Sequence, residues 1–372
     1  MKVEFANPLA QVVELRAEID RALTDVFSTG AFILGPNVQA LEREIAQLEG
    51  AKHAVALNSG TDALILPLMA AGIGPGDEVI TSPFTFVANV EAICIAGATP
   101  VFADIDEETF NIDPEQIRAR ITAKTKAVIP VHLFGQVADM TAINAIAREY
   151  GLVVIGDGAQ AIEAAQNGAP MGSLSDFATL SFYPTKNLGA CGDGGMVLTN
   201  DDAMLEQLKL LRFHGSGGGY TYKRIGFNSR LDEIQAAILR IKLRRLRAWN
   251  DMRRANAAVY DDALSPLADQ VATPTTFSGN RHTYHVYTIR VREGAAKRDA
   301  LKAHLAEREV GASVFYHLSL HLQDAYAYLG YKPGDMPVSE RVTQQVLSLP
   351  IHSHLSPEQV DFAAKTVAEF FA

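Results

Sequence analysis

Residues 178–199, ATLSFYPTKNLGACGDGGMVLT, place two apolar, strand-like runs on either side of a loop that carries one lysine, Lys186. Hydroxyl side chains flank this lysine and glycines follow it, so the backbone can approach a ligand closely. A lysine is more often a solvated surface charge. In an apolar, glycine-containing loop, however, partial burial favours the neutral and nucleophilic amine. The segment therefore predicts two strands of a sheet joined by a reactive loop.

Helical and strand-like patterns alternate on the N-terminal side of this segment, as a parallel α/β sheet requires. The strand-like runs are short and apolar, and most are followed by a run with helical spacing. We therefore expect an α/β fold with a mainly parallel sheet flanked by helices. Strands are expected at 53–57, within 72–82, and at 100–102, 127–135, 152–157, 178–184 and 195–200, and helices at 11–27, 37–48, 61–71, 86–96 and 140–151.

The pattern changes on the C-terminal side, where a long helix with one apolar stripe begins near Arg230. Such a helix can bridge two domains, and a smaller α+β unit follows it. We expect a large domain at 1–248 and a small C-terminal domain at 249–372. The arginines of 240–254 are expected on the solvated face of the long helix. In the small domain we expect strands at 284–291 and 312–316, and helices at 297–309 and after Pro357.

The composition excludes several classes of protein. The 372 residues include 33 Lys and Arg against 43 Asp and Glu, a net charge of −10, which disfavours nucleic-acid binding. The two cysteines, Cys94 and Cys191, exclude a disulfide framework, and no Cys/His spacing suggests a metal site. No signal peptide and no apolar run of about 20 residues is present, so we expect a cytoplasmic protein without a membrane segment.

An acid follows the apolar run LVVIGD, which ends at Asp157, with Gln160 three residues later. The end of a parallel strand lies at the sheet edge where open α/β folds bind ligands. A lone aspartate there is usually a cap or a turn former. Lys186 follows the next apolar strand, so the acid and the amine are expected to lie at the same edge.

A phosphate site is indicated where the strand at 53–57 gives way to Asn58-Ser59-Gly60-Thr61 and a helix. Free N–H groups at a helix N-terminus bind phosphate, and Thr61 adds a hydroxyl. Taken alone, such a stretch is more commonly an ordinary Ser/Thr cap. Ser181 could reach the same phosphate from the lysine loop.

These pieces fit one cofactor. Pyridoxal phosphate needs a lysine for its aldehyde, an acid near its ring nitrogen and a phosphate pocket. Phe86 could stack on the ring, although a core phenylalanine is an equally good interpretation of that segment alone.

The chain resembles the DegT/StrS-type sugar aminotransferases, which are pyridoxal-phosphate enzymes of fold type I. The resemblance covers nearly the whole chain. It rests on motifs in family order and spacing: NSGTDAL (58–64), GPGDEVITSPFTFVA (74–88), GDGAQA (156–161), SFYPTKNLGACGDGG (181–195) and FNSRLDEIQAA (227–237).

The resemblance implies a role for each matching residue. The catalytic pair is the Schiff-base lysine, Lys186, and the aspartate on the ring nitrogen, Asp157. Further cofactor contacts are Gln160 near the ring hydroxyl, Phe86 on the ring face, and Gly60, Thr61 and Ser181 on the phosphate. Asn228 is implied to reach the phosphate in the other subunit, which makes the enzyme a homodimer. Substrate contacts are implied for Arg230, Tyr316 and His321.

The chain departs from the family pattern at two places. The family often has Glu-Asp where this chain has Gly156-Asp157, and a small residue other than glycine at Gly158. We expect these glycines to loosen the turn beneath the ring. The segment at 316–321 also differs from the usual family motif, which weakens the substrate assignments there.

The implied reaction is transamination of a nucleotide-linked ketosugar, with glutamate as the implied amino donor. GTDAL at 60–64 resembles the members that act at C3, so a 3-ketosugar is favoured over a 4-ketosugar. A cofactor-holding regulatory protein without turnover is the other alternative. Lys186 disfavours the sugar dehydratases of the family, which lack this lysine, and the missing glycine fingerprint disfavours a nicotinamide dehydrogenase.

Overall fold

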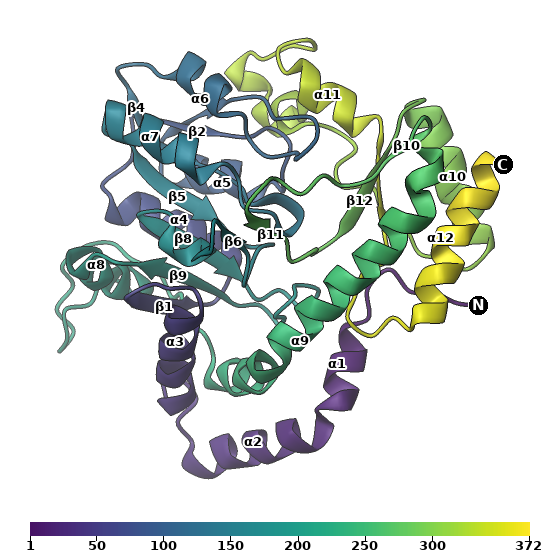
Figure 1. The fold of residues 1–372 in the computed structure, drawn as a ribbon. Helices are drawn as coiled ribbons and strands as arrows, with labels where there is room; N and C mark the ends of the chain where they lie inside the picture. Colours follow the sequence, from purple (N-terminus) through teal and green to yellow (C-terminus); the bar gives the residue numbers. More distant parts are fainter.

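The computed structural model describes residues 1–372, and its main element is a twisted seven-stranded sheet (Figure 1). Its strands are β1 (His53–Leu57), β2 (Glu78–Thr81), β3 (Thr99–Phe102), β4 (Thr125–Ile129), β5 (Val153–Asp157), β8 (Phe177–Ser181) and β9 (Gly195–Thr199). They lie in the order β1-β9-β8-β5-β4-β2-β3. Only β9 runs antiparallel to its neighbours, so the expected mainly parallel sheet is confirmed.

Helices cover both faces of this sheet, because alternate strand residues point to opposite sides. In β1, Ala54 and Ala56 join the hydrophobic cluster on one face, and Val55 and Leu57 join the cluster on the other. The first face is covered by α3 (Pro36–Leu48), α7 (Met140–Tyr150) and the first half of α9 (Glu233–Leu264). The second face is covered by α4 (Gly60–Ala70), α5 (Ala88–Ile95) and α8 (Asp202–Arg212).

The C-terminal part forms a smaller α+β unit with a hydrophobic core of its own. An antiparallel sheet in the order β10-β12-β13 packs against α10 and α12. Its elements are β10 (Val271–Ala272), β12 (Tyr287–Val291), α10 (Ala295–Glu307), α11 (Pro337–Thr343), β13 (Val346–Leu349) and α12 (Pro357–Phe371). The expected strand at 312–316 is wrong, because only Ser313 makes an isolated bridge, to Ser348.

Short elements connect the two parts. The link is a small three-stranded sheet of β6 (Ala165–Gln166), β7 (Ala169–Pro170) and β11 (Asn280–Arg281), whereas α6 (Pro114–Arg120) lies within the large part and packs on α7. β11 pairs with β6, so a segment near the small unit is hydrogen-bonded to the large one. At the N-terminus, two helices replace the single one expected at 11–27: α1 (Pro8–Glu14) and α2 (Arg16–Thr29).

The long helix α9 joins the two cores without a break (Figure 1). Leu246 packs in the core of the large sheet, whereas Ala257 packs in the core of the small unit. The core therefore changes along this helix, in the region where we propose the domain boundary at residue 248.

The expected solvated face for the arginines of this helix is wrong for Arg253, which is 4% exposed. None of the helices combines the length and apolar character needed to cross a membrane.

Candidate active site

A cavity of about 520 Å³ lies at the carboxyl ends of the parallel strands. This is the sheet edge where ligands bind in open α/β folds. Loops from the large sheet form most of its wall, and residues 285–286 and 315–316 of the C-terminal part complete it. Eight of the residues expected from the sequence line this one cavity: Gly60, Thr61, Phe86, Asp157, Gln160, Ser181, Lys186 and Tyr316.

The lysine loop between β8 and β9 is held by buried polar contacts. The Asn187 amide donates hydrogen bonds to the Asn250 side chain (2.8 Å) and to the Thr283 carbonyl (2.9 Å). The Lys242 ammonium donates to the Gly189 carbonyl at 2.7 Å. These bonds tie the loop to α9 and to residue 283, and so fix the backbone from which the lysine projects.

The Lys186 amine lines the cavity without a hydrogen bond or an ion pair inside the protein. Burial lowers the pKa of Lys186 to about 8, and the nearby Asp157 carboxyl acts against this shift. Burial disfavours the charged form of an amine. The neutral nucleophile is therefore far more populated near neutral pH than it is in an exposed lysine.

The Asp157 carboxyl lies at the end of β5 and is almost fully buried. Its Oδ1 accepts hydrogen bonds from the Ala159 N–H (3.0 Å) and the Thr179 hydroxyl (3.4 Å). Burial raises the pKa of Asp157, while the Ala159 N–H, the amide of Asn89, and the amine of Lys186 oppose that shift. A cationic N–H group in the cavity would be a favourable partner for this carboxyl.

The turn beneath this aspartate is tightly packed, which corrects the expectation that its glycines loosen it. A Cβ at Gly158 would collide with the Met171 side chain and approach the Thr179 carbonyl to 2.9 Å. The Gly158 N–H donates to that same carbonyl at 2.9 Å, and the Asp157 N–H donates to the Pro130 carbonyl at 2.9 Å. The Met171 side chain fills the space that a larger residue at 158 would need.

The Gln160 side chain forms hydrogen bonds with Phe134 on one side and with Tyr316 on the other. Its Oε1 accepts a hydrogen bond from the Phe134 N–H at 2.8 Å, which leaves its amide Nε2 as the donor. Nε2 lies 3.3 Å from the Tyr316 hydroxyl. Gln160 belongs to the large part and Tyr316 to the C-terminal part, so this contact links the two parts at the cavity wall.

The N-terminus of α4 forms a cradle suited to phosphate. The Ser59 hydroxyl caps the helix by accepting the Asp62 N–H at 3.1 Å, while the Gly60 and Thr61 N–H groups make no hydrogen bond within the protein. A Cβ at Gly60 would lie 2.7 Å from the Ser181 Cβ, so glycine permits this close approach. Free N–H groups at a helix N-terminus favour an anion.

Phe86 sits on the cavity wall with 57% of its surface exposed. It therefore does not act as a core phenylalanine, the alternative interpretation of its segment. An exposed aromatic ring beside a cavity gains apolar contact when a flat ligand stacks on it.

Asn228 and Arg230 do not line this cavity. They line a neighbouring hollow of about 570 Å³, which shares Ser59 and Asp193 with it. The Arg230 guanidinium donates to the Asn228 Oδ1 at 2.5 and 3.1 Å and lies over the Phe213 ring at 4.8 Å.

His321 does not line either space, because it is 1% exposed and its Nε2 lies 3.1 Å from the Glu340 carboxylate. Its ring packs edge-on against Phe102 and Tyr331. The substrate contact expected for His321 is therefore wrong: its ring is buried against Glu340 and lines neither space.

Sequence reasoning missed Asn89, a residue of α5 that lines the cavity and is 1% exposed. Neither atom of its amide has a hydrogen-bond partner, although the group lies close enough to Asp157 to lower the pKa of that carboxyl. An unpaired buried amide is costly, so a ligand contact would satisfy it. The only signal in the sequence was an amide residue at the start of a mainly apolar helix, which also carries Glu91.

We predict that Asn89→Ala weakens cofactor binding about tenfold, the cost of one lost hydrogen bond. Equilibrium titration of the apoprotein with pyridoxamine phosphate measures this affinity. Asn89→Ser, which restores a donor, is expected to recover part of the loss. Equal affinities for the wild type and the alanine variant would show that the amide plays no part in binding.

The residues present fit pyridoxal phosphate. One cavity contains an amine of lowered pKa for the aldehyde, a buried carboxyl for the ring nitrogen, and free helix N–H groups with a hydroxyl for the phosphate. The unpaired amide of Asn89 adds a polar group that lacks a partner inside the protein.

Comparison with known proteins gives a consistent result. Residues 13–368 match the DegT/DnrJ/EryC1/StrS aminotransferase family. A pleiotropic regulatory protein of Geobacillus stearothermophilus is 50% identical over 100% of this chain and 99% of its own. A UDP-N-acetyl-3-dehydro-alpha-D-glucosamine 3-aminotransferase of Acidithiobacillus ferrooxidans is 44% identical over 94% of this chain and 93% of its own. The crystal structure of S. venezuelae DesV superposes with a TM-score of 0.96 at 41% identity, covering 99% of this chain and 98% of that one.

Proposed function

This chain belongs to the DegT/DnrJ/EryC1/StrS aminotransferase family, and we propose that it transfers an amino group from glutamate to C3 of a nucleotide-linked 3-ketosugar. Family membership makes it a pyridoxal-phosphate-dependent sugar aminotransferase. The observation that carries the proposal is the convergence of Lys186, Asp157 and Gln160 on one cavity with a phosphate cradle.

When bound, pyridoxal phosphate supplies an aldehyde that accepts the amino group and a ring that withdraws electrons. Lys186 would act at its Nζ, taking a proton from the donor's Cα and delivering it to the cofactor carbon on the other side of the shared nitrogen; such positioned acid–base catalysis is worth about 10²–10⁴-fold. Asp157 holds a proton on the ring nitrogen through its free oxygen. Gln160 and Phe86 would hold the cofactor ring, so that one carbon of the sugar meets the reacting nitrogen.

The choice of C3 rests on the GTDAL motif at 60–64, and the name of the Acidithiobacillus relative supports it. A displacement of about 1 Å costs on the order of 10²-fold, so one cavity should strongly prefer one ring position. The test is a panel of nucleotide-linked aminosugars run backwards with 2-oxoglutarate. Activity on 3-amino isomers alone supports the proposal. Efficient turnover of a 4-amino isomer, with none on any 3-amino isomer, replaces it with the 4-keto alternative.

A second candidate is a regulatory protein that holds the cofactor without turnover, which the name of the Geobacillus relative favours. The visible spectrum separates the two. A transaminase bleaches when glutamate is added, since its cofactor accepts the amino group, whereas a sensor keeps its colour with every donor. A reactive amine of lowered pKa in the same cavity as an acid favours turnover.

We predict that Asn228 serves the site of a second subunit. It lies outside the cavity of its own chain, in a hollow that adjoins the phosphate cradle. Mixing inactive Lys186→Ala with inactive Asn228→Ala should restore about a quarter of wild-type activity, because half of the randomly formed two-fold dimers contain one undamaged site. Activity after subunit exchange, checked with differently tagged chains, is the measurement. No recovery in a mixture that has exchanged would assign Asn228 to its own chain.

A further inference from the structure

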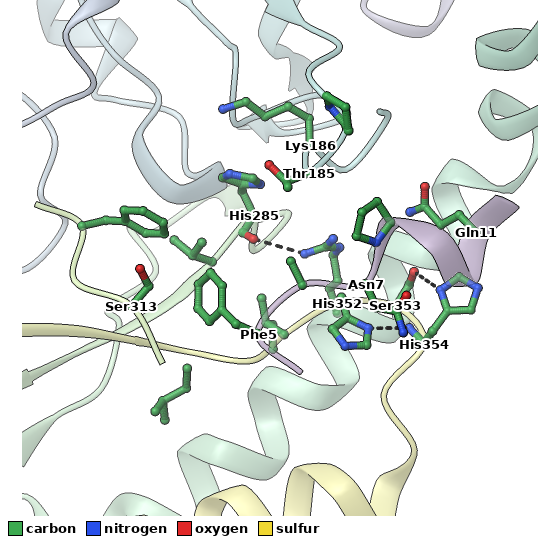
Figure 2. A pocket seen from close by; sticks show the side chains of 18 residues that line it. Phe5, Asn7, Gln11, Thr185, Lys186, His285, Ser313, His352, Ser353 and His354 are labelled. Atoms are coloured by element: carbon green, nitrogen blue, oxygen red, sulfur yellow. Dashed lines mark hydrogen bonds between the residues drawn. The ribbon is translucent and has the colours of Figure 1, made fainter. Parts of the chain in front are cut away.

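A second cavity, of about 210 Å³, lies on the other side of the lysine loop (Figure 2). It is enclosed by the N-terminal segment with α1, by α9, and by residues 349–354 after β13. Figure 2 shows Lys186, Thr185 and His285 on one wall, with Gln11, His352 and His354 on another. The cavity shares five lining residues with the active-site cavity: Thr185, Lys186, His285, Val286 and Phe315.

Besides Lys186, this cavity contains the Arg253 guanidinium, which is buried without a carboxylate partner. Its Nη1 donates to the Tyr284 carbonyl (3.0 Å) and the His285 carbonyl (3.2 Å), and Nε and Nη2 make no hydrogen bond in the protein. Burial lowers the pKa of Arg253 to about 10, so the group stays cationic at neutral pH. A buried cation without a counterion is costly.

The remaining polar lining suits an anion as well. None of the 18 lining residues is an aspartate or a glutamate. The carboxylate of Glu14 lies 2.8 Å from the Nε2 of the lining residue His354, but Glu14 itself does not line the cavity. The Gln11 side chain is 6% exposed, and its Oε1 has no partner. The Gln11 Nε2 can donate to an anion, and the Thr185 and Ser313 hydroxyls add further donors.

We propose that this cavity binds a small carboxylate, anchored by the free edge of the Arg253 guanidinium and by the Gln11 amide. The flat fork of an arginine matches two carboxylate oxygens. At about 30 Å³ for each water molecule, the volume equals roughly seven waters, which is enough for acetate or a short dicarboxylate. Because Lys186 lies on the wall, a bound anion would also stabilise its ammonium form.

The carboxylate could come from a free short-chain acid or from the oxo acid that the amino donor leaves behind. These sources share the same chemistry at Arg253 and differ in size. The second source rests on the proposed function, whereas the first does not. A test by direct binding therefore separates failure of this proposal from failure of the aminotransferase assignment.

The first test uses crystals of the holoenzyme soaked in bromide, whose anomalous scattering locates a bound anion. We expect a peak within hydrogen-bonding distance of the Arg253 guanidinium that disappears when acetate is added. Displacement by both acetate and 2-oxoglutarate identifies the oxo acid as a ligand, and displacement by acetate alone identifies a free short acid. No peak in the wild type, or a peak that acetate does not displace, overturns the proposal.

The second test measures the shift in Tm that acetate produces at constant ionic strength. At ten times its dissociation constant, acetate should raise the Tm of the wild type by about 2 °C. Arg253→Met should lose this shift, and Gln11→Leu should reduce it. The matched control is Arg247→Met, on an exposed position of the same helix, which should keep the shift. Equal shifts in Arg253→Met and the wild type would contradict the proposed anchor, and if Arg253→Met does not fold, the bromide map decides.

Discussion

Replacing Lys186 with alanine is expected to lower kcat for sugar amination by at least about 10³-fold. The side chain supplies both the covalent attachment for the aldehyde and the proton carrier, so alanine removes two functions at once. The bonds that hold its loop come from Asn187 and Lys242 rather than from its own amine. We therefore expect the variant to fold and to keep its affinity for pyridoxamine phosphate.

The measurement is single-turnover and steady-state kinetics of the reaction run backwards, with a nucleotide-linked aminosugar and 2-oxoglutarate as substrates. Lys302→Ala, on an exposed position of α10, is the matched control and should keep wild-type rates. Lys186→Arg retains a charge but is not a nucleophile near neutral pH, so it should be as inactive as the alanine variant. Turnover within about tenfold of the wild type in Lys186→Ala would remove the lysine from the mechanism, since positioned acid–base catalysis alone exceeds that.

The same lysine should make cofactor attachment depend on pH. Burial lowers the pKa of Lys186 to about 8, and only the neutral amine attacks an aldehyde. The rate at which the apoprotein binds pyridoxal phosphate covalently should therefore rise from pH 7 to pH 8 and level off above about pH 9. Stopped-flow absorbance follows this rate.

Much of this site could be predicted from the sequence, because its parts depend on local patterns. Asp157 and Lys186 each follow a short apolar run, and parallel strands bring their carboxyl ends to one edge. Gly60 and Thr61 open a helix that a serine caps. Each of these positions follows from its neighbours in the chain, so no knowledge of distant contacts was needed.

Arg253 shows where such reasoning fails. Its charge led to the expectation of a solvated position, yet Leu246, Trp249, Arg253, Ala257 and Tyr260 recur every three or four residues along the buried side of α9. Helical periodicity predicts burial for the whole stripe. Periodicity prevailed over residue type here because backbone carbonyls of a distant loop accept the guanidinium protons.

Asn89 and His321 were misjudged for a related reason. The sequence gives no sign that an amide in the apolar helix α5 faces Asp157, since the two residues belong to different strand–helix units. His321 was placed by its motif near the substrate, but Glu340, from a helix further along the chain, holds its ring in the interior. Both outcomes depend on contacts between distant segments.

Asp157→Asn is expected to lower kcat by about 10²–10³-fold, the usual cost of removing one preorganised electrostatic partner from an active site. Asparagine has nearly the same shape, and its Oδ1 can still accept the Ala159 N–H. It carries no negative charge, however, so it cannot hold a proton on the ring nitrogen. The electron-withdrawing capacity of the site is lost while its packing is kept.

The Asp157→Asn variant should lose activity without losing thermal stability. This combination separates the chemical role of Asp157 from a folding defect. Burial raises the pKa of Asp157 above its usual value, so at neutral pH the carboxylate of the apoprotein destabilises the folded state. The neutral amide removes this cost, and the Tm of apo Asp157→Asn should equal or exceed that of the wild type at pH 7. The stability difference should shrink as the pH falls through the usual range of aspartate, where the acid is neutral in both states.

Two further variants locate the effect at the position of the charge. Asp157→Glu keeps the charge but shifts it by one methylene, so it should recover only part of kcat. Asp269→Asn removes an exposed carboxylate and should leave kcat unchanged.

If Asp157→Asn kept wild-type kcat with an unchanged cofactor spectrum, another group would have to neutralise the ring nitrogen. Apart from Asp157, the only carboxylate that lines the cavity is Asp193, which lies at the end of the lysine loop just before β9. Asp193→Asn would then be the variant that loses activity.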